Sequence, residues 1–291
     1  MHTQLLGIDW GTSNRRAYLV GRDGKCLARH ADEQGMLAVG GDFAASLAHL
    51  RQRMEVADGV PVVMSGMVGS ASGWQEVAYL DTKVPLTDLP AHLVPVQGHA
   101  GCFIVPGYCT RDGAVDVMRG EETQLLGAVG RGLLDGWVVL PGTHSKWVYL
   151  RGGKVDQLIT YMTGELFSML AAGGTLAALM AGGPDDETAF NAGLQEARRA
   201  RPLSNALFGV RARVVSKTMA AAQARSFVSG LLIGTEFVAA QGHADGAIDI
   251  IGSPLLAARY ESAAAHFGMP ARAHDPDEVY LAALAYFFES V

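Results

Sequence analysis

The chain has 291 residues, of which 49% are hydrophobic and 18% are charged, and its formal net charge is −6. This length suits two moderate domains, and the acidic balance argues against a general nucleic-acid binder. The opening MHTQLLGIDWG shows no secretory signal, no apolar run is long enough to span a bilayer, and the three cysteines lack metal-ligand spacing. We therefore expect a cytoplasmic protein with reduced thiols that binds neither nucleic acid nor membrane.

The first half alternates strand-like and helical segments. Residues 5–30 predict three short strands, joined by a GTSN turn and by Asp23-Gly24, a pair typical of hairpins. Apolar residues at helical spacing then predict a helix over 42–57 with Asp42 as its N-cap. Residues 60–66 and 102–107 predict two further short strands.

The second half repeats this order. Residues 136–162 again predict three strands with a Gly-Thr and a Gly-Gly turn, and Gly142-Thr143 can be laid on Gly11-Thr12 through the hairpin without a gap. The remainder predicts helices and strands in alternation, with helices over 166–181, 216–241, 254–268 and 277–290 and strands over 247–252 and 271–275. Such a repeat indicates a duplicated α/β architecture, and a chance likeness of two hairpins is the alternative.

Each half carries a turn suited to phosphate. Asp9 ends the first buried strand, and Gly11-Thr12-Ser13-Asn14 follow it, so backbone N–H groups and hydroxyls point into one concavity. A carboxylate at such a strand end can hold Mg²⁺ through its water shell. The second turn, Gly142-Thr143-His144-Ser145, repeats the pattern without the acid. An ordinary Asp-x-Gly hairpin turn and a purely structural repeat are the alternatives.

An acidic segment lies between the two halves. Arg119-Gly120-Glu121-Glu122 opens a stretch that becomes apolar. A carboxylate beside a phosphate site can accept the proton of an attacking hydroxyl, and an arginine there can bind a phosphate or a substrate carboxylate. Glutamates in a first helical turn also stabilise the helix dipole, and an arginine also serves as a solvated surface charge, so both interpretations stay open.

A strand-to-helix junction predicts an adenosine site. Residues 250–254 (IIGSP) read as a buried strand that stops at Gly252, where a planar base can approach the backbone. The helix that follows has Ser253 as its expected N-cap and a proline in its first turn.

These motifs, in this order, resemble the actin/hexokinase/heat-shock ATPase superfamily. More closely, the runs IDWGTSNRRA, PVVMSGMVGS, VMRGEETQLLGA, PGTHSKWV, MTGEL and SGLLIG resemble the 2-dehydro-3-deoxygalactonokinase family over essentially the whole chain. The resemblance implies an α/β fold of two duplicated actin-like ATPase (ribonuclease H-like) domains with an interdomain nucleotide cleft. We place the N-terminal domain at 1–117 and the C-terminal domain at 118–275, with the closing helix 276–291 packing back on the first domain.

The family implies a carbohydrate kinase with ATP and Mg²⁺ as cofactors, which phosphorylates 2-dehydro-3-deoxy-D-galactonate at its 6-hydroxyl in galactonate catabolism. Asp9 then resembles the metal-organising catalytic acid. Glu121 resembles the catalytic base, with Glu122 as second choice because the alignment is ambiguous by one residue. The positions that resemble the family's nucleotide-binding residues are Gly11, Thr12, Ser13, Asn14, Gly142, Thr143, His144, Gly252 and Ser253.

The sugar-acid pocket is predicted from one loop and three cations. Residues 64–79 follow a strand and supply four side chains that suit a sugar, namely Ser70, Trp74, Glu76 and Tyr79. A structural loop with Trp74 in the core is the alternative. The substrate carboxylate requires a cation, for which the candidates are Arg16, Arg119 and Lys146.

Three questions stay open at this point. The chain could phosphorylate the epimeric 2-dehydro-3-deoxy-D-gluconate instead, because no residue in a sequence reports the orientation of one hydroxyl. It could also be a non-kinase nucleotide-dependent sensor or ATPase of the same superfamily. The apolar segment 166–241 could form a homodimer or serve only core packing.

Overall fold

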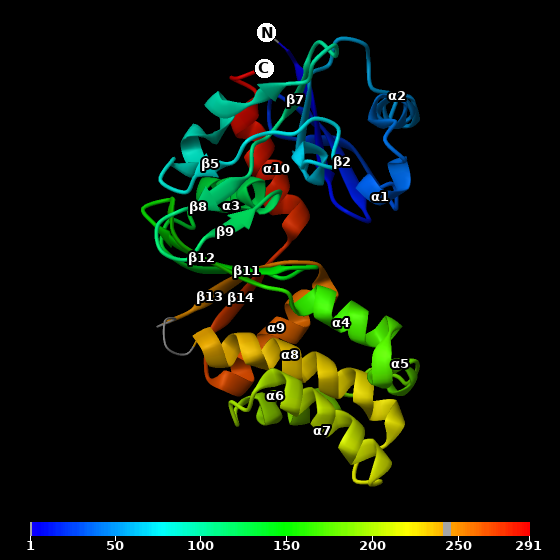
Figure 1. Cartoon of the computed structure of the whole chain (residues 1–291). Helices are drawn as coiled ribbons and strands as arrows, with labels where there is room; N and C mark the ends of the chain where they lie inside the picture. The colour runs from blue at the N-terminus through cyan, green and yellow to red at the C-terminus, as the bar shows by residue number, and fades with distance from the viewer. Residues whose placement is uncertain (1, 241–245) are drawn as a thin grey trace. The chain divides into compact units, whose positions relative to one another are not determined.

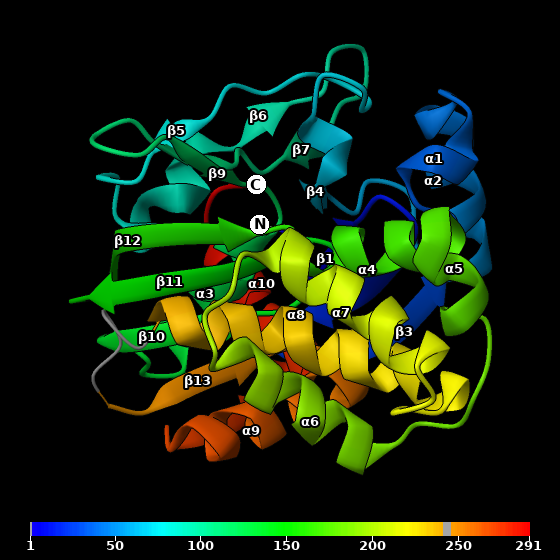
Figure 2. The same ribbon diagram turned by 60° about the horizontal axis from the view of Figure 1, so that its bottom comes forward.

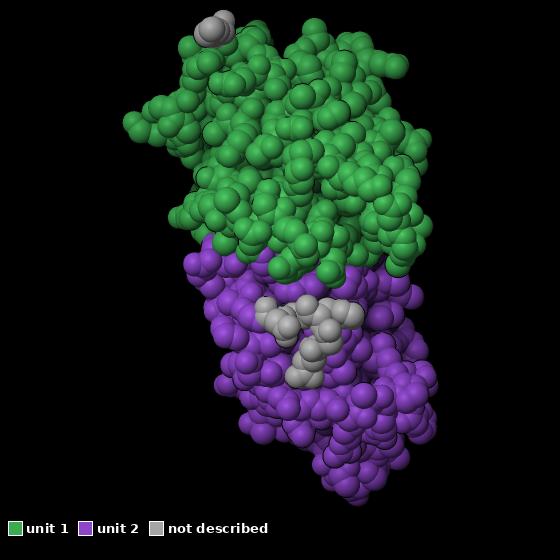
Figure 3. Space-filling view, turned by 90° about the vertical axis from the view of Figure 1, so that its left-hand side faces the viewer, with its two compact units in different colours: residues 1–135, 148–158, 275–291 green, residues 136–147, 159–274 purple. Residues whose placement is uncertain are grey.

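The structure is a computed structural model that describes residues 2–240 and 246–291 (Figure 1). Contacts within the chain divide it into two compact units, which Figure 3 colours separately. Unit 1 holds residues 1–135, 148–158 and 275–291, and unit 2 holds residues 136–147 and 159–274.

The main sheet of unit 1 has the strand order β3-β2-β1-β4-β7-β6. β1 pairs antiparallel with β2 and parallel with β4, and β4 pairs parallel with β7. Leu6, Ile8 and Trp10 of β1 face one hydrophobic core, while Gly7 on the other face packs against Leu284. The strands are β1 (Gln4–Trp10), β2 (Arg15–Gly21), β3 (Cys26–Asp32), β4 (Val62–Gly66), β6 (Val94–Pro95) and β7 (Cys102–Ile104).

Helices and a small second sheet complete unit 1. The helices are α1 (Met36–Val39), α2 (Phe43–Arg53), α3 (Glu121–Gly130) and α10 (Pro276–Phe287), and two 3₁₀ turns cover Met67–Gly69 and Leu86–His92. The small sheet has the order β5-β8-β9 and consists of β5 (Leu80–Asp81), β8 (Tyr108–Thr110) and β9 (Asp116–Met118). Asp42 is the N-cap of α2, as predicted, because its carboxylate accepts a hydrogen bond from the N–H of Ala45 at 3.0 Å.

The second sheet has the order β12-β11-β10-β13-β14, which matches β3-β2-β1-β4-β7 strand for strand. β10 pairs parallel with β13, and β13 with β14, as β1 does with β4 and β4 with β7. The predicted duplication is therefore confirmed. The strands are β10 (Gly136–Leu140), β11 (Ser145–Arg151), β12 (Lys154–Tyr161), β13 (Ile248–Ile251) and β14 (Ala271–His274).

Unit 2 adds a layer of helices. Figures 1 and 2 show α6, α7 and α8 running side by side, and glycines of α8 allow this: a Cβ at Gly230 would overlap the carbonyl oxygen of Phe190 in α6. The helices are α4 (Thr163–Ala172), α5 (Gly174–Met180), α6 (Glu187–Ala197), α7 (Leu203–Val215), α8 (Ala224–Ala240) and α9 (Pro254–Phe267), with a 3₁₀ turn at Ala221–Gln223.

Two predicted helices of unit 2 were wrong in extent. The helix expected over 166–181 is two helices, α4 and α5, because the chain breaks at Gly173-Gly174 and Gly174 has a φ of 74°. The helix expected over 216–241 begins only at Ala224, since Lys217 has a φ of 61° that ends the preceding helix; residue 241 lies outside the described residues.

The bent pair of α4 and α5 also bears on membrane insertion. Within the described ranges no single helix is long and apolar enough to cross a membrane, whereas this pair, bent by 83°, passes the same test by length and composition.

The domain boundaries stay a prediction, and the contact-based units divide the chain differently. Residues 118–135, which we assigned to the C-terminal domain, lie in unit 1, as do residues 148–158. Residues 118–135 lie in unit 1 because they include α3, and α3 packs against α10 of unit 1 at Gly127.

Gly127→Ala should destabilise the protein. A Cβ at this position would overlap the carbonyl oxygen of Val279 in α10, and backbone atoms cannot yield as a flexible side chain can. We expect a loss of about 2–3 kcal/mol in the free energy of unfolding, measured by chemical denaturation.

The matched control is Gly209→Ala in α7, where the added Cβ would meet the flexible ends of Arg213, at 3.2 Å, and of Arg201, at 3.9 Å. That variant should be neutral or gain up to about 1 kcal/mol from helix propensity. Equal stability of both variants would contradict the close packing of α3 on α10.

Candidate active site

The first phosphate turn lies where β1 ends and β2 begins, beside Asp9. The N–H of Gly11 donates to the carbonyl of Asn14 at 2.9 Å and closes the turn. The N–H of Met36 donates to the carbonyl of Gly11 at 2.9 Å, and Gly35 lies so close that a Cβ there would overlap the turn backbone. The start of α1 therefore braces the carbonyl side of the turn, while Ser13 and Asn14 are exposed.

Asp9 is held in an ion-pair network. Its carboxylate accepts a hydrogen bond from Arg16 at 2.6 Å, and Arg16 also lies 3.5 Å from Asp277 of α10. The Tyr18 hydroxyl donates to the same Asp277 carboxylate at 2.7 Å. Burial lowers the pKa of Arg16. The nearby charge of Asp9 and weaker contributions outweigh this effect, so the pKa of Arg16 is raised overall. Burial also raises the pKa of Tyr18.

A Mg²⁺ site here would draw on one protein carboxylate. No group of three or more His, Cys, Asp or Glu side chains able to hold a metal occurs in residues 2–240 and 246–291. Mg²⁺ usually keeps several waters and takes one or two carboxylates together with substrate phosphates. The partly exposed carboxylate of Asp9 fits that pattern.

Gly66 brings the acidic segment beside Asp9. It ends β4 with a φ of 89°, and a Cβ there would lie 2.7 Å from the Trp10 carbonyl oxygen and 3.5 Å from Oδ1 of Asp9. On its other side, a Cβ on Gly120 would lie 3.2 Å from the Cα of Gly66. The turn that carries Glu121 therefore lies against the strand end that carries Asp9.

The two glutamates of that turn have different surroundings. Glu121 is half-buried, and its carboxylate accepts a hydrogen bond from the N–H of Arg119 at 3.0 Å. Glu122 is fully buried, and both its carboxylate oxygens lie within 2.9 Å of the N–H of Gly120. Burial, strengthened by the charge of Glu121, raises the pKa of Glu122 to about 8. Only Glu121 can meet a ligand in this conformation.

Arg119 ties the acidic turn to the loop over 64–79. Its Nη2 donates to the carbonyl of Val77 at 2.7 Å, and its guanidinium lies 4.1 Å from the ring centre of Tyr79. The Nε and Nη1 atoms are buried and have no hydrogen-bond partner among the described residues. A Cβ at Gly69 would lie 2.8 Å from Nη1, so this loop presses directly on the guanidinium.

The other predicted sugar-binding side chains of the loop do not converge. The Trp74 ring stacks on Phe43 at 6.1 Å and meets His99 edge-on at 4.8 Å, which places it against the core of unit 1. Ser70 contacts the sulfur of Met36 at 3.5 Å, and Glu76 is exposed. The structural alternative for Trp74 thus has direct packing support.

The second phosphate turn is built in unit 2 against the start of α4. The N–H of Glu165 donates to the carbonyl of Thr143 at 2.8 Å, and the Glu165 carboxylate lies 2.6 Å from Nε2 of His144. Gly164 is required at its position because a Cβ there would overlap the carbonyl oxygen of Gly142. The TGE run of the sequence, to which no role was assigned, thus forms one wall of this turn.

Lys146 points away from the exposed part of the turn. It is buried, with 5% of its surface exposed, and its Nζ donates to the Thr160 hydroxyl at 3.0 Å.

The predicted adenosine junction adjoins the second turn. Gly252 is buried, and a Cβ there would lie 2.8 Å from the ring of Pro141, directly before the turn. Ser253 is at the N-cap position of α9 with Pro254 after it, but its hydroxyl makes no capping hydrogen bond.

A small pocket of about 70 Å³ lies beside the second turn. Its walls come from the second turn, α4, α8 and α9, and are formed by Pro141, Gly142, Thr163, Gly164, Phe167, Ser229, Leu232, Ile233, Leu256, Arg259 and Tyr260. Apolar walls with a few polar groups are typical of a small-molecule pocket.

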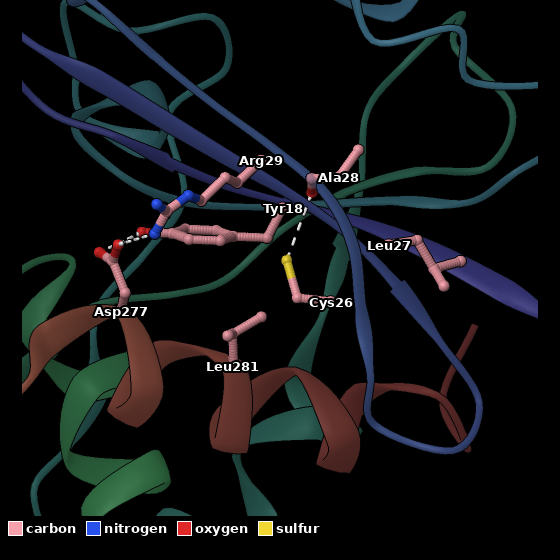
Figure 4. A pocket seen from close by; sticks show the side chains of 7 residues that line it. All are labelled: Tyr18, Cys26, Leu27, Ala28, Arg29, Asp277 and Leu281. Atoms are coloured by element: carbon pink, nitrogen blue, oxygen red, sulfur yellow. Dashed lines mark hydrogen bonds and ion pairs between the residues drawn. The ribbon is translucent and has the colours of Figure 1, made fainter.

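A larger cavity of about 420 Å³ lies in unit 1, and none of the predicted site residues lines it (Figure 4). It lies between β2, β3 and α10, and Asp277 at its edge accepts the hydrogen bond from Tyr18 and lies 3.7 Å from Arg29. Asp277 also faces Arg16, so the cavity and the ion-pair network of Asp9 share one carboxylate.

The predicted residues therefore form two groups. Unit 1 holds Asp9, the first turn, Arg16, the loop and the acidic turn, and unit 2 holds the second turn, Lys146 and the adenosine junction. Sequence reasoning assigned no role to four residues that hold these groups in place, namely Gly35, Gly66, Gly164 and Asp277. Asp277 lies more than 250 residues from Arg16, and no local pattern could pair them.

Comparisons with known proteins agree over nearly the whole chain. A family model described as 2-keto-3-deoxy-galactonokinase matches residues 9–287. A protein of Rhizobium meliloti (strain 1021) named as a probable 2-dehydro-3-deoxygalactonokinase is 36% identical over 289 residues, covering 96% of this chain and 94% of that protein. The 2-dehydro-3-deoxygalactonokinase of Escherichia coli (strain K12) is 36% identical over 268 residues, covering 90% of each.

Solved structures give the same result for the fold. A crystal structure of a candidate 2-dehydro-3-deoxygalactonokinase from Sinorhizobium meliloti has a TM-score of 0.90 at 35% identity, covering 96% of this chain and 94% of that one. The activator of 2-hydroxyisocaproyl-CoA dehydratase from Clostridium difficile with bound ADPNP has a TM-score of 0.52 at 11% identity, covering 99% and 95%, and shares the fold alone.

Glu122→Gln should remove a pH dependence of stability. Because the folded protein holds the Glu122 proton up to a pKa of about 8, against an ordinary pKa of 4.5, this stabilisation is complete below pH 4.5 and is lost as the pH rises through 8. The free energy of unfolding of the variant, relative to the parent, should therefore rise between pH 6 and pH 9 by a few kcal/mol at most, on the order of 1.4 kcal/mol per pKa unit.

The control is Glu187→Gln, which changes an exposed first-turn glutamate of α6. Its stability relative to the parent should not vary over the same pH range. A flat difference for Glu122→Gln as well would contradict burial of a neutral Glu122.

Proposed function

The chain belongs to the 2-keto-3-deoxy-galactonokinase family, and from this membership we propose that it transfers the γ-phosphoryl group of ATP to the 6-hydroxyl of 2-dehydro-3-deoxy-D-galactonate in galactonate catabolism. The family resemblance and the fold class, two duplicated actin-like halves, are confirmed. The observation that carries the proposal is the close approach of Gly120 to Gly66, which brings the acidic turn to the strand end beside Asp9 and the first phosphate turn.

The nucleotide is proposed to bind through both turns. In unit 2, the turn at Gly142 to His144 offers backbone N–H groups beside the start of α4, an arrangement that favours phosphate. The small apolar pocket beside Gly142 and α9 is proposed to receive one edge of the base, and the Arg259 guanidinium on its wall donates to the Ser229 hydroxyl at 3.1 Å. In unit 1, Gly11, Thr12, Ser13 and Asn14 are proposed to hold the transferred phosphoryl group.

Asp9 is proposed to hold the Mg²⁺ that accompanies ATP, and this ion would neutralise charge on the phosphates. Arg16 pairs with the Asp9 carboxylate at 2.6 Å and so holds that side chain in place. Because ATP is an intracellular substrate, the reaction is expected in the cytoplasm.

Glu121 is the proposed general base. It is half-buried and adjoins Asp9 through Gly66, whereas Glu122 is fully buried and bound to the N–H of Gly120. A base must reach the hydroxyl whose proton it takes, so accessibility favours Glu121.

The sugar acid is proposed to bind to unit 1 beside this base. Of the three cations considered for its carboxylate, Arg16 is 34% exposed, whereas Lys146 and two nitrogens of Arg119 are buried. Arg16 is therefore the preferred partner. Ser70, Glu76 and Tyr79 stay predictions as sugar contacts, and a homodimer stays a prediction as well.

Two other functions remain as outcomes of the tests. A kinase of the gluconate-derived epimer would use the same residues, and the stereochemistry of one hydroxyl would decide between them. A nucleotide-dependent sensor would hydrolyse ATP at a rate that no sugar acid stimulates. The match of the 2-keto-3-deoxy-galactonokinase family model to residues 9–287 favours a kinase.

Asp9→Asn should abolish phosphoryl transfer without unfolding the protein. The variant keeps the shape of the side chain but loses the charge that would hold Mg²⁺, so kcat should fall by roughly 10²-fold or more. Kinase activity at several Mg²⁺ concentrations, with circular dichroism as the folding control, tests this. Near-normal activity would remove Asp9 from the proposed metal site.

Glu121→Gln should lower kcat by about 10²- to 10⁴-fold, the range for loss of a general base, with little change in the KM for ATP. Glu122→Gln is the neighbouring control and should keep most of its turnover at pH 7. The opposite result, a large loss in Glu122→Gln alone, would shift the base by one residue.

A further inference from the structure

Glu236 is a buried carboxylate in unit 2 that no predicted role includes. It lies on α8 and is 1% exposed. Its Oε2 accepts hydrogen bonds from the Ser145 hydroxyl at 2.8 Å and from Nε1 of Trp147 at 2.7 Å. Its Oε1 accepts a hydrogen bond from the Tyr260 hydroxyl at 2.7 Å, and the Thr163 side chain is a further partner.

Each donor belongs to a segment next to proposed nucleotide-binding residues. Ser145 directly follows the second phosphate turn and begins β11. Thr163 begins α4, whose next residue, Gly164, packs against the turn. Tyr260 lies on α9, the helix that follows the adenosine junction. The Glu236 carboxylate thus connects the second phosphate turn to α4 and to α9, two helices that line the small pocket.

The hydrogen-bond chemistry requires an acceptor at this position. The indole of Trp147 can only donate, so its partner must be an oxygen acceptor. A carboxylate provides two oxygens that together can accept from all four donors, whereas glutamine provides one oxygen and turns an NH₂ group toward donors. Burial raises the pKa of Glu236, and its donors, including Thr163, Trp147, Tyr260 and Ser145, oppose that rise.

We infer that Glu236 is a positioning residue for the nucleotide, which fixes the second phosphate turn against α4 and α9 through Ser145, Trp147 and Tyr260. It does not touch ATP: its carboxylate is enclosed by its donors, and only their segments reach the pocket. The inference rests on the proposed function for the identity of the nucleotide.

The test compares Glu236→Gln with Glu196→Gln in the full-length protein. Glu196 is the matched control because it is also buried in unit 2, at 4% exposure, but binds Arg199, Arg201 and Arg213 far from the turn in sequence. The measured quantities are kcat, the KM for MgATP, the KM for the sugar acid, the Kd of a non-hydrolysable ATP analogue and the melting temperature.

Glu236→Gln should raise the KM for MgATP and the Kd of the analogue roughly tenfold, the size of one lost hydrogen bond to a charged group, and leave the KM for the sugar acid unchanged. Glu196→Gln should lower the melting temperature without moving either nucleotide constant. Trp147→Phe, which removes a single donor, should shift the nucleotide constants in the same direction by a smaller factor, and it serves if Glu236→Gln does not fold.

A double-mutant cycle then separates positioning from general destabilisation. If Glu236 acts through Ser145, the effects of Ser145→Ala and Glu236→Gln on analogue binding should not add in the double variant. Additive effects, or an unchanged Kd in Glu236→Gln, would overturn the inference while leaving the kinase proposal intact. A parent protein that binds the analogue in a Glu236-dependent way but never phosphorylates the sugar acid would overturn the kinase proposal alone.

Discussion

The proposed chemistry of unit 1 depends on the close backbone approach at Gly66. A Cβ on Gly66 would lie 2.7 Å from the carbonyl oxygen of Trp10, and its φ of 89° suits glycine. A Cβ on Gly120 would lie 3.2 Å from the Cα of Gly66, so a side chain at position 120 would push the acidic turn away from the end of β4. The close approach of Gly66 and Gly120 therefore brings the turn that carries Glu121 near the strand end that carries Asp9, although the two acids are far apart in sequence.

The duplicated sheet explains why the two turns share a geometry but not a chemistry. The turn after β1 follows Asp9, whereas the turn after β10 follows Leu140 and Pro141, so only the first copy can serve a metal. Each copy is braced differently. Backbone hydrogen bonds from the start of α1 hold the first turn, and α4 together with the Glu236 network holds the second.

Local sequence patterns predicted the five strands that each duplicated sheet shares, the duplication and the positions of both turns, because hairpins and caps are encoded by neighbouring residues. They did not predict the short strands β5, β6, β8 and β9 or the helices α6 and α7. The same patterns missed the break at Gly173-Gly174, since a single glycine pair within an apolar stretch does not by itself end a helix. They also missed Glu236 and Asp277, whose roles come from partners on other elements. Trp74 was ambiguous for the same reason, as only Phe43 and His99 reveal its packing. Contacts between residues that are far apart in the sequence were therefore what local patterns could not predict.

The most direct test of the sugar-acid kinase assignment is the rate of ADP release from MgATP, measured with the two epimeric 2-dehydro-3-deoxy sugar acids in parallel. The account predicts strong turnover with the galactonate-derived acid and little with the gluconate-derived one. Equal turnover would keep the kinase but contradict its selectivity for the galactonate-derived acid. ATP hydrolysis that neither acid stimulates would contradict the kinase and favour a nucleotide-dependent sensor.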